Sequence, residues 1–305
     1  MTAPQGPVLV TGASGFAGGH LVEHLRAEGE TVVGWDLPDH DLLNRSALIE
    51  AVRTLRPGQV YHCAGAPHVA AAWSETTKTF RANVLATHYL LDALRQAGHA
   101  CRMLITGSAT VYTPSEHALV EDDPAVPNNP YGLSKLAQEQ LGLQGGVDDG
   151  VEVIVTRSFN HTGPRQRPAF AAPAITRQFA LMEAGALEPV LRVGNIDTRR
   201  DITDVRDVAR AYRLLMQRGT PGTVYNVCSG RAHAIRDIVE GLQARLGRSV
   251  EIETNPDLLR RNDTPVILGN PGRLIDTTGW APAISFGQML DDLLDYWRQD
   301  VRHSA

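Results

Sequence analysis

Three side chains in this sequence have the types and spacing for proton and hydride chemistry: Tyr131, Lys135 and Ser108. Tyr131 and Lys135 are four residues apart at the start of a helix that Asn129-Pro130 predicts, so both lie on one helical face. A free tyrosine has a pKa near ~10 and is a poor base at neutral pH, but a lysine ammonium beside it favours the phenolate. Tyr131 can then take a proton from a substrate hydroxyl or return one to a carbonyl.

Ser108 supplies the third group of this predicted catalytic set. The strand predicted at Met103–Thr106 ends in Gly107-Ser108, which places a hydroxyl at the carboxyl edge of the sheet. From there Ser108 can hydrogen-bond the reacting oxygen and align it with Tyr131. Tyrosine and lysine at this spacing also describe an ordinary solvated helix face, and it is the third residue that favours a redox site.

A glycine-rich turn near the start of the chain predicts the partner for this chemistry. An apolar strand stops at Gly12, and the chain must then turn into a helix. A side chain at Gly12 or Gly15 would block a pyrophosphate from the N–H groups at the positive end of that helix, and Gly18 lets the helix pack on the strand. We predict a dinucleotide site here that includes Ser14 and Phe16, although glycines at this spacing also fit a plain surface turn.

Asp36 follows the second apolar run, about twenty residues beyond the glycines. A carboxylate at this position accepts hydrogen bonds from an adenosine ribose and repels a 2′-phosphate, which favours NAD over NADP. An arginine beside it, such as Arg26 or Arg45, would reverse that preference. The alternative is that Asp36 only caps the next turn.

The composition indicates a globular enzyme: the chain has 305 residues, 43% hydrophobic and 21% charged, with a formal net charge of −5. There is no basic patch for nucleic acid, no leader pattern and no apolar run of the ~20 residues that a membrane span needs. We therefore expect a cytoplasmic protein with no nucleic-acid or membrane partner. Cys63, Cys101 and Cys228 are widely spaced, and the histidines lack metal-ligand spacing, so we predict small core cysteines and no metal site.

Short apolar runs alternate with helical patterns along the chain. This alternation predicts an α/β fold, a Rossmann-type doubly wound parallel sheet. The expected strands lie near residues 7–11, 31–35, 59–64, 102–107, 151–156 and 223–227. Pro-rich and Arg-rich segments interrupt the pattern beyond the later strands, where ligands bind in such sheets. We predict an NAD(P)-binding domain at 1–162 and about 204–230, and a smaller substrate-binding lobe at about 163–203 and 231–305.

These residues resemble the extended short-chain dehydrogenases/reductases, the NAD-dependent epimerase/dehydratase family that acts on nucleotide sugars. The set of Ser108, Tyr131 and Lys135 matches the catalytic triad of that family. The resemblance implies further cofactor contacts, from Asp41 and Leu42 near the adenine, from Ala64 and Gly65 at the end of the third strand, and from Asn83.

The second half resembles the branch that contains GDP-mannose 4,6-dehydratase and GDP-4-dehydro-6-deoxy-D-mannose reductase, the reductase more closely. The matching motifs are Arg157–Pro164, Val193–Asn195, Arg200–Asp207 and Tyr225–Gly230. By this resemblance the substrate is a nucleotide sugar, expected to be GDP-linked. Asn160 should contact it, Arg200 and Arg260 should hold its diphosphate, and Asp263 should lie near the nucleoside.

The resemblance also implies a homodimer. Its interface would be a helix bundle formed by the apolar faces around Thr79–Leu94 and Tyr131–Leu143. The same faces could equally be ordinary core faces.

The segment after Ser108 bears on the reaction. Elimination of water across carbons 5 and 6 needs a carboxylate, which dehydratases resembling this chain place just after the triad serine. Here Thr110, a predicted substrate contact, stands in that segment, and no acid follows until Glu116, which argues against dehydration.

The expected function is NAD(P)H-dependent reduction at carbon 4 of a GDP-4-keto-6-deoxy-hexose. The main alternative is a nucleotide-sugar 4-epimerase with tightly bound NAD, because the motif Ser-Ala-Thr-Val-Tyr at 108–112 also resembles that of such epimerases. A 4,6-dehydratase and a non-catalytic NAD-sensing protein are the lesser alternatives.

Overall fold

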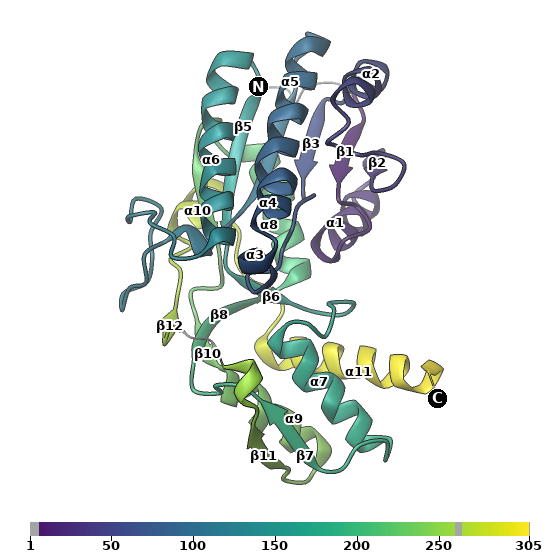
Figure 1. Cartoon of the computed structure of the whole chain (residues 1–305), viewed down its shortest axis with the longest axis vertical. Helices are drawn as coiled ribbons and strands as arrows, with labels where there is room; N and C mark the ends of the chain where they lie inside the picture. Colours follow the sequence, from purple (N-terminus) through teal and green to yellow (C-terminus); the bar gives the residue numbers. More distant parts are fainter. Residues whose placement is uncertain (1–5, 260–263, 305) are drawn as a thin grey trace.

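A six-stranded parallel sheet forms the centre of the molecule in the computed structural model, which describes residues 6–259 and 264–304. Its strand order is β2-β1-β3-β4-β5-β9 (Figure 1). The strands are β1 (Val8–Thr11), β2 (Val32–Trp35), β3 (Gln59–His62), β4 (Arg102–Ser108), β5 (Glu152–Ser158) and β9 (Val224–Val227). The predicted doubly wound α/β sheet is confirmed, and the six strands lie where the apolar runs predicted them.

Helices cover both faces of this sheet, and each face has its own hydrophobic core. One core includes apolar side chains from α1 (Phe16–Ala27), α8 (Val205–Arg218) and α10 (Gly272–Thr278). The other includes side chains from α2 (Arg45–Leu55), α5 (Ala86–Ala97) and α6 (Pro130–Asp149). Strands buried on both faces explain the continuous Val/Ile/Leu runs of the sequence, since neither face can be polar.

The helix that leads into α5 is irregular. It runs from α3 (Ala71–Ser74) through α4 (Thr76–Phe80) and then passes through one π-helical turn at Arg81–Leu85. Such turns insert an extra residue into a helix and are common at functional sites. This one carries Asn83, whose side chain is buried.

A second lobe lies below the sheet in Figure 1 and has a hydrophobic core of its own. Three helices build it, α7 (Ala171–Glu183), α9 (Ile235–Leu246) and α11 (Phe286–Ser304), together with paired strands β7 (Val190–Val193) and β11 (Glu251–Thr254). Further short elements are β6 (Asn160–Thr162), β8 (Arg199–Asp204), β10 (Ala232–Ala234), β12 (Val266–Ile267) and the 3-10 turns at Ala109–Val111 and Pro256–Leu258.

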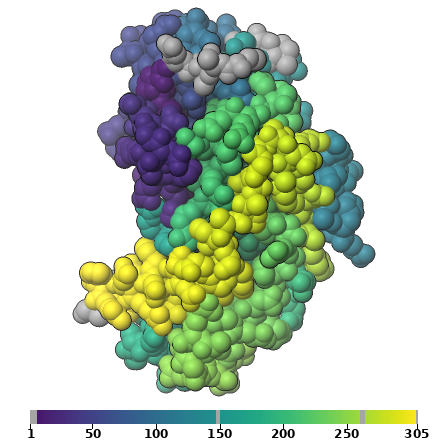
Figure 2. Space-filling view, turned by 180° about the vertical axis from the view of Figure 1, so that it is seen from behind, coloured from purple at the N-terminus to yellow at the C-terminus, as the bar shows by residue number. Residues whose placement is uncertain are grey.

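The chain crosses between the lobes more than once. Figure 2 shows from behind that the yellow C-terminal segment runs from the upper lobe into the lower one. Leu274 and Trp280, within the segment 231–305, pack in the core that includes α1 and α8, whereas Met289 and Leu293 pack in the core of the second lobe.

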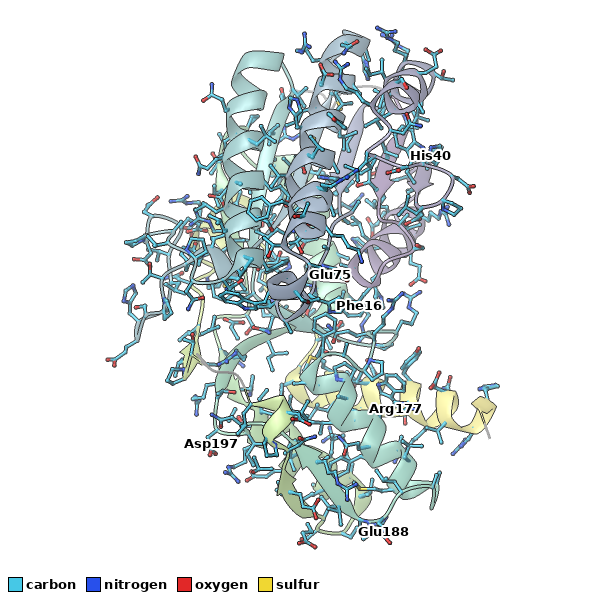
Figure 3. The ribbon with its side chains drawn as sticks, in the orientation of Figure 1. Phe16, His40, Glu75, Arg177, Glu188 and Asp197 are labelled. Atoms are coloured by element: carbon cyan, nitrogen blue, oxygen red, sulfur yellow. The ribbon has the colours of Figure 1, made fainter. Side chains whose placement is uncertain are left out.

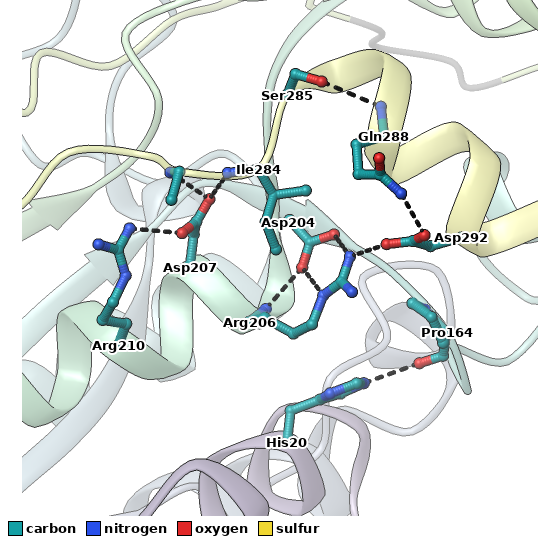
Figure 4. A network of polar contacts seen from close by, with 11 residues as sticks. His20, Pro164, Asp204, Arg206, Asp207, Arg210, Ile284, Ser285, Gln288 and Asp292 are labelled. Atoms are coloured by element: carbon teal, nitrogen blue, oxygen red, sulfur yellow. Dashed lines mark hydrogen bonds and ion pairs between the residues drawn. The ribbon is translucent and has the colours of Figure 1, made fainter. Parts of the chain in front are cut away.

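Ion pairs and hydrogen bonds tie α8 to α11 at this junction (Figure 4). Arg206 contacts Asp204 at 2.7 Å and Asp292 of α11 at 2.5 Å. Asp207 accepts hydrogen bonds from the backbone N–H groups of Ala283 and Ile284, both at 2.9 Å. The segment before α11 is thereby fixed to the first turn of α8.

Among the residues that the structure describes, no helix is long and apolar enough to cross a membrane. The same residues hold no group of three or more His, Cys, Asp or Glu side chains arranged to bind a metal ion. Cys101 and Cys228 are buried, as predicted for core cysteines, and Cys63 is half-buried.

Candidate active site

The glycine turn forms a tight backbone cradle between β1 and α1. Gly12 has φ +71°, and a Cβ there would lie 2.8 Å from the backbone of Ala64. A Cβ at Gly15 would lie 3.0 Å from the carbonyl oxygen of Gly12, and one at Gly18 would overlap that oxygen. α1 begins at Phe16, and the first N–H groups of a helix have no partner within it. The cradle therefore offers a dinucleotide pyrophosphate the N–H groups and positive dipole that it requires.

Asp36 lies directly after β2, and its carboxylate reaches this turn. The backbone N–H of Ser14 donates to its two oxygens at 2.9 and 3.1 Å. The carboxylate is thus fixed beside the glycines, where an adenosine ribose would lie in a Rossmann site. Arg45 forms an ion pair with Asp92 at 2.6 Å, so its guanidinium is engaged with α5.

The two predicted adenine contacts have different surroundings. Asp41 is used locally, because its carboxylate accepts a hydrogen bond from the N–H of Leu43 at 2.9 Å. The Leu42 side chain is buried in the core with Trp35 and Leu48.

Asn83 connects the loop after β3 to α6. Its Oδ1 accepts a hydrogen bond from the N–H of Ala66 at 2.8 Å, and its Nδ2 donates to Ser134 Oγ at 2.9 Å. A Cβ at Gly65 would lie 2.6 Å from Asn83 Oδ1 and 3.8 Å from Lys135 Nζ. The loop of Ala64 and Gly65 therefore runs close to Lys135, and its contact with a cofactor stays a prediction.

The structure brings Ser108 and Tyr131 together at the carboxyl edge of the sheet. Ser108 ends β4, and Tyr131 lies in the first turn of α6, which Asn129 caps by accepting from the N–H of Gly132 at 2.8 Å. Burial raises the pKa of Tyr131 to about 12, and a hydrogen bond with Ser108 opposes this rise. Thr110 donates its hydroxyl to Ser108 Oγ at 2.9 Å.

Lys135 is buried next to this pair. Its ammonium donates to the carbonyl oxygen of Thr106 and to Gln138 Oε1, both at 2.8 Å. Burial lowers the pKa of Lys135 to about 8, while the nearby Cys63 thiol acts in the opposite direction. Sequence reasoning missed Gln138, although its i+3 spacing from Lys135 is a signal that could have found it.

A buried ion pair holds α6, which carries Tyr131 and Lys135, against β5. The carboxylate of Glu139 accepts two hydrogen bonds from Arg157, at 2.9 and 2.7 Å. Arg157 also donates to the carbonyl oxygen of Glu121 at 2.9 Å and lies 4.6 Å from the ring centre of Tyr112. Tyr131, Lys135 and Glu139 share one helix, so this pair fixes the helix that carries two of the three predicted catalytic residues.

α1 also contacts the segment that leads into the second lobe. The ring of Phe16, labelled at the junction in Figure 3, stacks on His161 with centroids 6.0 Å apart. His20 Nε2 donates to the carbonyl oxygen of Pro164 at 2.9 Å (Figure 4), and Arg165 forms an ion pair with Glu23. Burial lowers the pKa of His161, which is consistent with a packing role beside the cradle.

Some of the predicted substrate contacts lie within the residues that the structure describes, and others do not. Asn160 is exposed on β6, and β6 pairs with β8, which carries Arg200. The guanidinium of Arg200 donates to the carbonyl oxygens of Arg199 and Thr264, both at 2.8 Å. Arg260 and Asp263 lie outside the described residues.

Comparisons with known proteins identify the family of this chain. The model of the GDP-mannose 4,6 dehydratase family matches residues 35–293. GDP-6-deoxy-D-mannose reductase from Pseudomonas aeruginosa is 39% identical over 97% of this chain and 98% of that protein. The structure of RMD from Pseudomonas aeruginosa complexed with NADPH has a TM-score of 0.90 at 38% identity, covering 97% of this chain and 100% of that one.

A nucleotide-sugar epimerase is also similar. The structure of UDP-glucose 4-epimerase from Thermus thermophilus in complex with NAD has a TM-score of 0.85 at 28% identity and covers 96% of this chain and 99% of that one. The predicted resemblance to the epimerase/dehydratase family is confirmed. Because the family model spans most of the chain and the P. aeruginosa reductase aligns over nearly all of it, this protein belongs to the GDP-mannose 4,6 dehydratase family.

Proposed function

We propose that this protein is an NAD(P)-dependent nucleotide-sugar oxidoreductase that reduces the carbon-4 ketone of a GDP-linked 4-keto-6-deoxy-hexose. The observation that carries the proposal is the placement of Ser108, Tyr131 and Lys135 at one sheet edge, beside the glycine cradle. The similarity to GDP-6-deoxy-D-mannose reductase over the whole chain supports the substrate class.

Each residue has a distinct part in the proposed reaction. When bound, a reduced nicotinamide supplies the hydride that carbon 4 receives. Ser108 donates a hydrogen bond to the ketone oxygen, and Tyr131 gives that oxygen its proton as the hydride adds, so the ketone becomes a hydroxyl. The charge of Lys135 stabilises the phenolate that proton donation leaves behind, and its ammonium binds the nicotinamide ribose. With a pKa of about 12, Tyr131 is protonated at neutral pH in the ligand-free chain, which is the state that reduction requires at its start.

The second lobe is the proposed sugar-nucleotide lobe. We assign to it residues 163–203 and 231–305, apart from the stretch around Leu274 and Trp280, which packs with α1 and α8; residues 1–162 and 204–230 form the NAD(P)-binding domain. Thr110, Asn160, Arg200, Arg260 and Asp263 stay predicted substrate contacts. Arginine forks suit diphosphate oxygens, which supports the two arginines in that role.

The surroundings of Thr110 argue against dehydration. Thr110 offers a hydroxyl to Ser108 at the position where dehydration needs a carboxylate, and Glu116, the next acid along the chain, is exposed. A neutral hydroxyl is too weak a base to remove the proton beside the ketone at neutral pH.

The first test follows the absorbance of the reduced cofactor when purified protein meets GDP-4-keto-6-deoxymannose. We expect stoichiometric loss of NADH or NADPH, and a decrease in kcat of at least about 100-fold for Tyr131→Phe. Tyr296→Phe, on α11 away from the cradle, is the matched control and should keep wild-type turnover. If no cofactor is consumed and NAD⁺ is released on denaturation of the purified protein, the reductase assignment is wrong and the 4-epimerase replaces it.

The fixed carboxylate of Asp36 supports NADH over NADPH as the preferred cofactor. A 2′-phosphate would meet this carboxylate beside Ser14 and be repelled. We expect Asp36→Asn to weaken the preference for NADH over NADPH, because kcat/KM for NADPH should rise relative to kcat/KM for NADH. Equal use of both cofactors by the unaltered protein would contradict this assignment.

A homodimer through the helices α4, α5 and α6 is also proposed. A groove of about 610 Å³ lies between them, with Phe80, Val84, Leu85 and Leu141 among its lining residues. The apolar lining of this groove and the resemblance to the family support a second copy of this chain as its occupant. Light scattering after size exclusion should give twice the chain mass, and Val84→Glu should give the monomer; a monomeric unaltered protein would contradict the proposal.

A further inference from the structure

Gln138 has two hydrogen-bond partners, and one of them is the catalytic lysine. It lies one turn after Lys135 on α6, and its side chain is fully buried. Its Oε1 accepts from Lys135 Nζ, and its Nε2 donates to Thr87 Oγ1 on α5, both at 2.8 Å. The amide thus connects the ammonium of Lys135 to a second helix.

The hydroxyl of Thr87 determines which way this amide points. Its only proton goes to the carbonyl oxygen of Asn83, at 2.7 Å. The Thr87 oxygen can therefore only accept from its other two neighbours, Gln138 Nε2 and His62 Nε2. In a flipped amide the NH₂ group would face the ammonium, so that two donors would meet. Its oxygen would face Thr87 Oγ1, so that two acceptors would meet. The carbonyl of Gln138 is held toward Lys135.

His62 continues the network to the first strand. Because Thr87 must accept, His62 carries its proton on Nε2, and its Nδ1 accepts from the hydroxyl of Thr11 at 2.8 Å. Thr11 Oγ1 in turn accepts from the N–H of Ala64 at 3.3 Å. Burial lowers the pKa of His62 to about 3, in agreement with the neutral ring that this pattern requires. The network runs from the cradle to the lysine, and its hydroxyls and ring nitrogens each have a partner.

We propose that Gln138 is a positioning residue that fixes the ammonium of Lys135 for hydride transfer, and that Thr87 and His62 hold Gln138 in place. This inference rests on the proposed function. An ammonium has three N–H donors. Within the described part of the chain, Thr106 and Gln138 take two of them, which leaves the third for the ribose that Lys135 is proposed to bind.

The other titratable groups near Lys135 do not provide this support. His62 is neutral, Cys63 has its thiol pKa raised by burial to about 12, and Tyr131 is protonated at neutral pH. The carbonyl oxygens of Thr106 and Gln138 are therefore the groups that stabilise the buried charge. Gln138→Leu removes one of these two acceptors at little change in size.

A ligand-free experiment tests the effect on Lys135 directly. Losing a hydrogen bond to a charged group should lower the pKa of Lys135 by roughly one unit in Gln138→Leu. The variant's unfolding constant, relative to that of the unaltered protein, should then decrease by about tenfold between pH 6 and pH 9. Gln140→Leu, at an exposed position of the same helix, is the control and should show a ratio that does not change with pH. A pH-independent deficit in Gln138→Leu would mean that Gln138 only fills and satisfies the core.

Kinetics provide the second test. Gln138→Leu should lower kcat with little change in KM for the sugar nucleotide, and should move the alkaline limb of the pH profile down by roughly one pH unit. Gln138→Glu, which adds a negative charge, should move that limb up. An unshifted limb in both variants would overturn the proposal. If the unaltered protein turns over no substrate, the proposed function fails, and the ligand-free experiment still decides the role of Gln138.

The Thr87 variants test the support behind Gln138. Thr87→Ser keeps the hydroxyl and should keep the kcat and pH profile of the unaltered protein. Thr87→Val keeps the shape but removes the hydroxyl, and should reproduce the alkaline-limb shift of Gln138→Leu. Equal pH profiles for the two variants would remove Thr87 from the proposal.

Discussion

Replacing Glu139 by glutamine tests how firmly α6 is held to the sheet. The Glu139 side chain is 1% exposed and pairs with Arg157, which is 6% exposed. Glutamine keeps the size and one acceptor but leaves the guanidinium charge buried without a counter-charge. Removing one partner of a buried ion pair lowers the free energy of unfolding by about 3–5 kcal/mol. Because the glutamine oxygen can still accept a hydrogen bond from Arg157, we expect a loss of about 3 kcal/mol. That loss is a large share of the ~5–15 kcal/mol typical of a folded protein.

The assay is urea unfolding followed by far-ultraviolet circular dichroism, with Glu183→Gln as the matched control. Glu183 pairs with Arg298 at 2.6 Å, but the two side chains are 40% and 29% exposed, so water can replace the lost partner. We expect the control to lose about 1 kcal/mol or less. If Glu139→Gln lowers the free energy of unfolding by no more than the control does, the view that the Glu139–Arg157 pair anchors α6 is refuted.

Two further predictions follow from the cradle and the lysine. Gly18→Ala should abolish NADH binding, because its Cβ would overlap the Gly12 carbonyl oxygen. Gly19→Ala, whose Cβ would lie 3.5 Å from the nearest atom, should bind NADH normally. Fluorescence titration measures both. Lys135→Met should change the pH dependence of stability. In the unaltered protein the lysine pKa is lowered from 10.5 to about 8, which destabilises the native state by about 3 kcal/mol at pH 7. This destabilisation disappears as the pH rises from 8 through 10.5. The stability of Lys135→Met relative to the unaltered protein should therefore decrease by about 2 kcal/mol between pH 7 and pH 10, and a difference that stays constant would contradict the lowered lysine pKa.

The sequence predicted the sheet and the cradle well because both depend on local signals. Residues 8–10 must be apolar on both faces, and Gly12 and Gly18 are required by close backbone approach. Asn129 caps α6 and Pro130 begins it, as their types indicate. These features need no knowledge of distant residues, so a single sequence contains them.

Contacts between distant segments were harder to predict. The Arg157–Glu139 pair and the Gln138–Thr87 hydrogen bond each join two elements, and neither residue of either pair marks its partner in the sequence. The π-helical turn that carries Asn83 has no known composition signal, so an ordinary helix was expected there. The predicted role of Arg200 depends on a bound diphosphate and stays a prediction.

The second core has a consequence for how the protein folds during synthesis. α7 and α11 pack in the same core, yet the sequence from the end of one at Glu183 to the start of the other at Phe286 spans about a hundred residues. At ~5–20 residues per second, α7 leaves the ribosome roughly 5–20 s before α11 exists to cover its apolar face. During that interval the core that contains Phe179 and Ile175 lacks the side chains of α11, although α9 is made earlier, and is open to contacts with other nascent chains. The yield of native protein should therefore depend on what shelters this helix until α11 has been made.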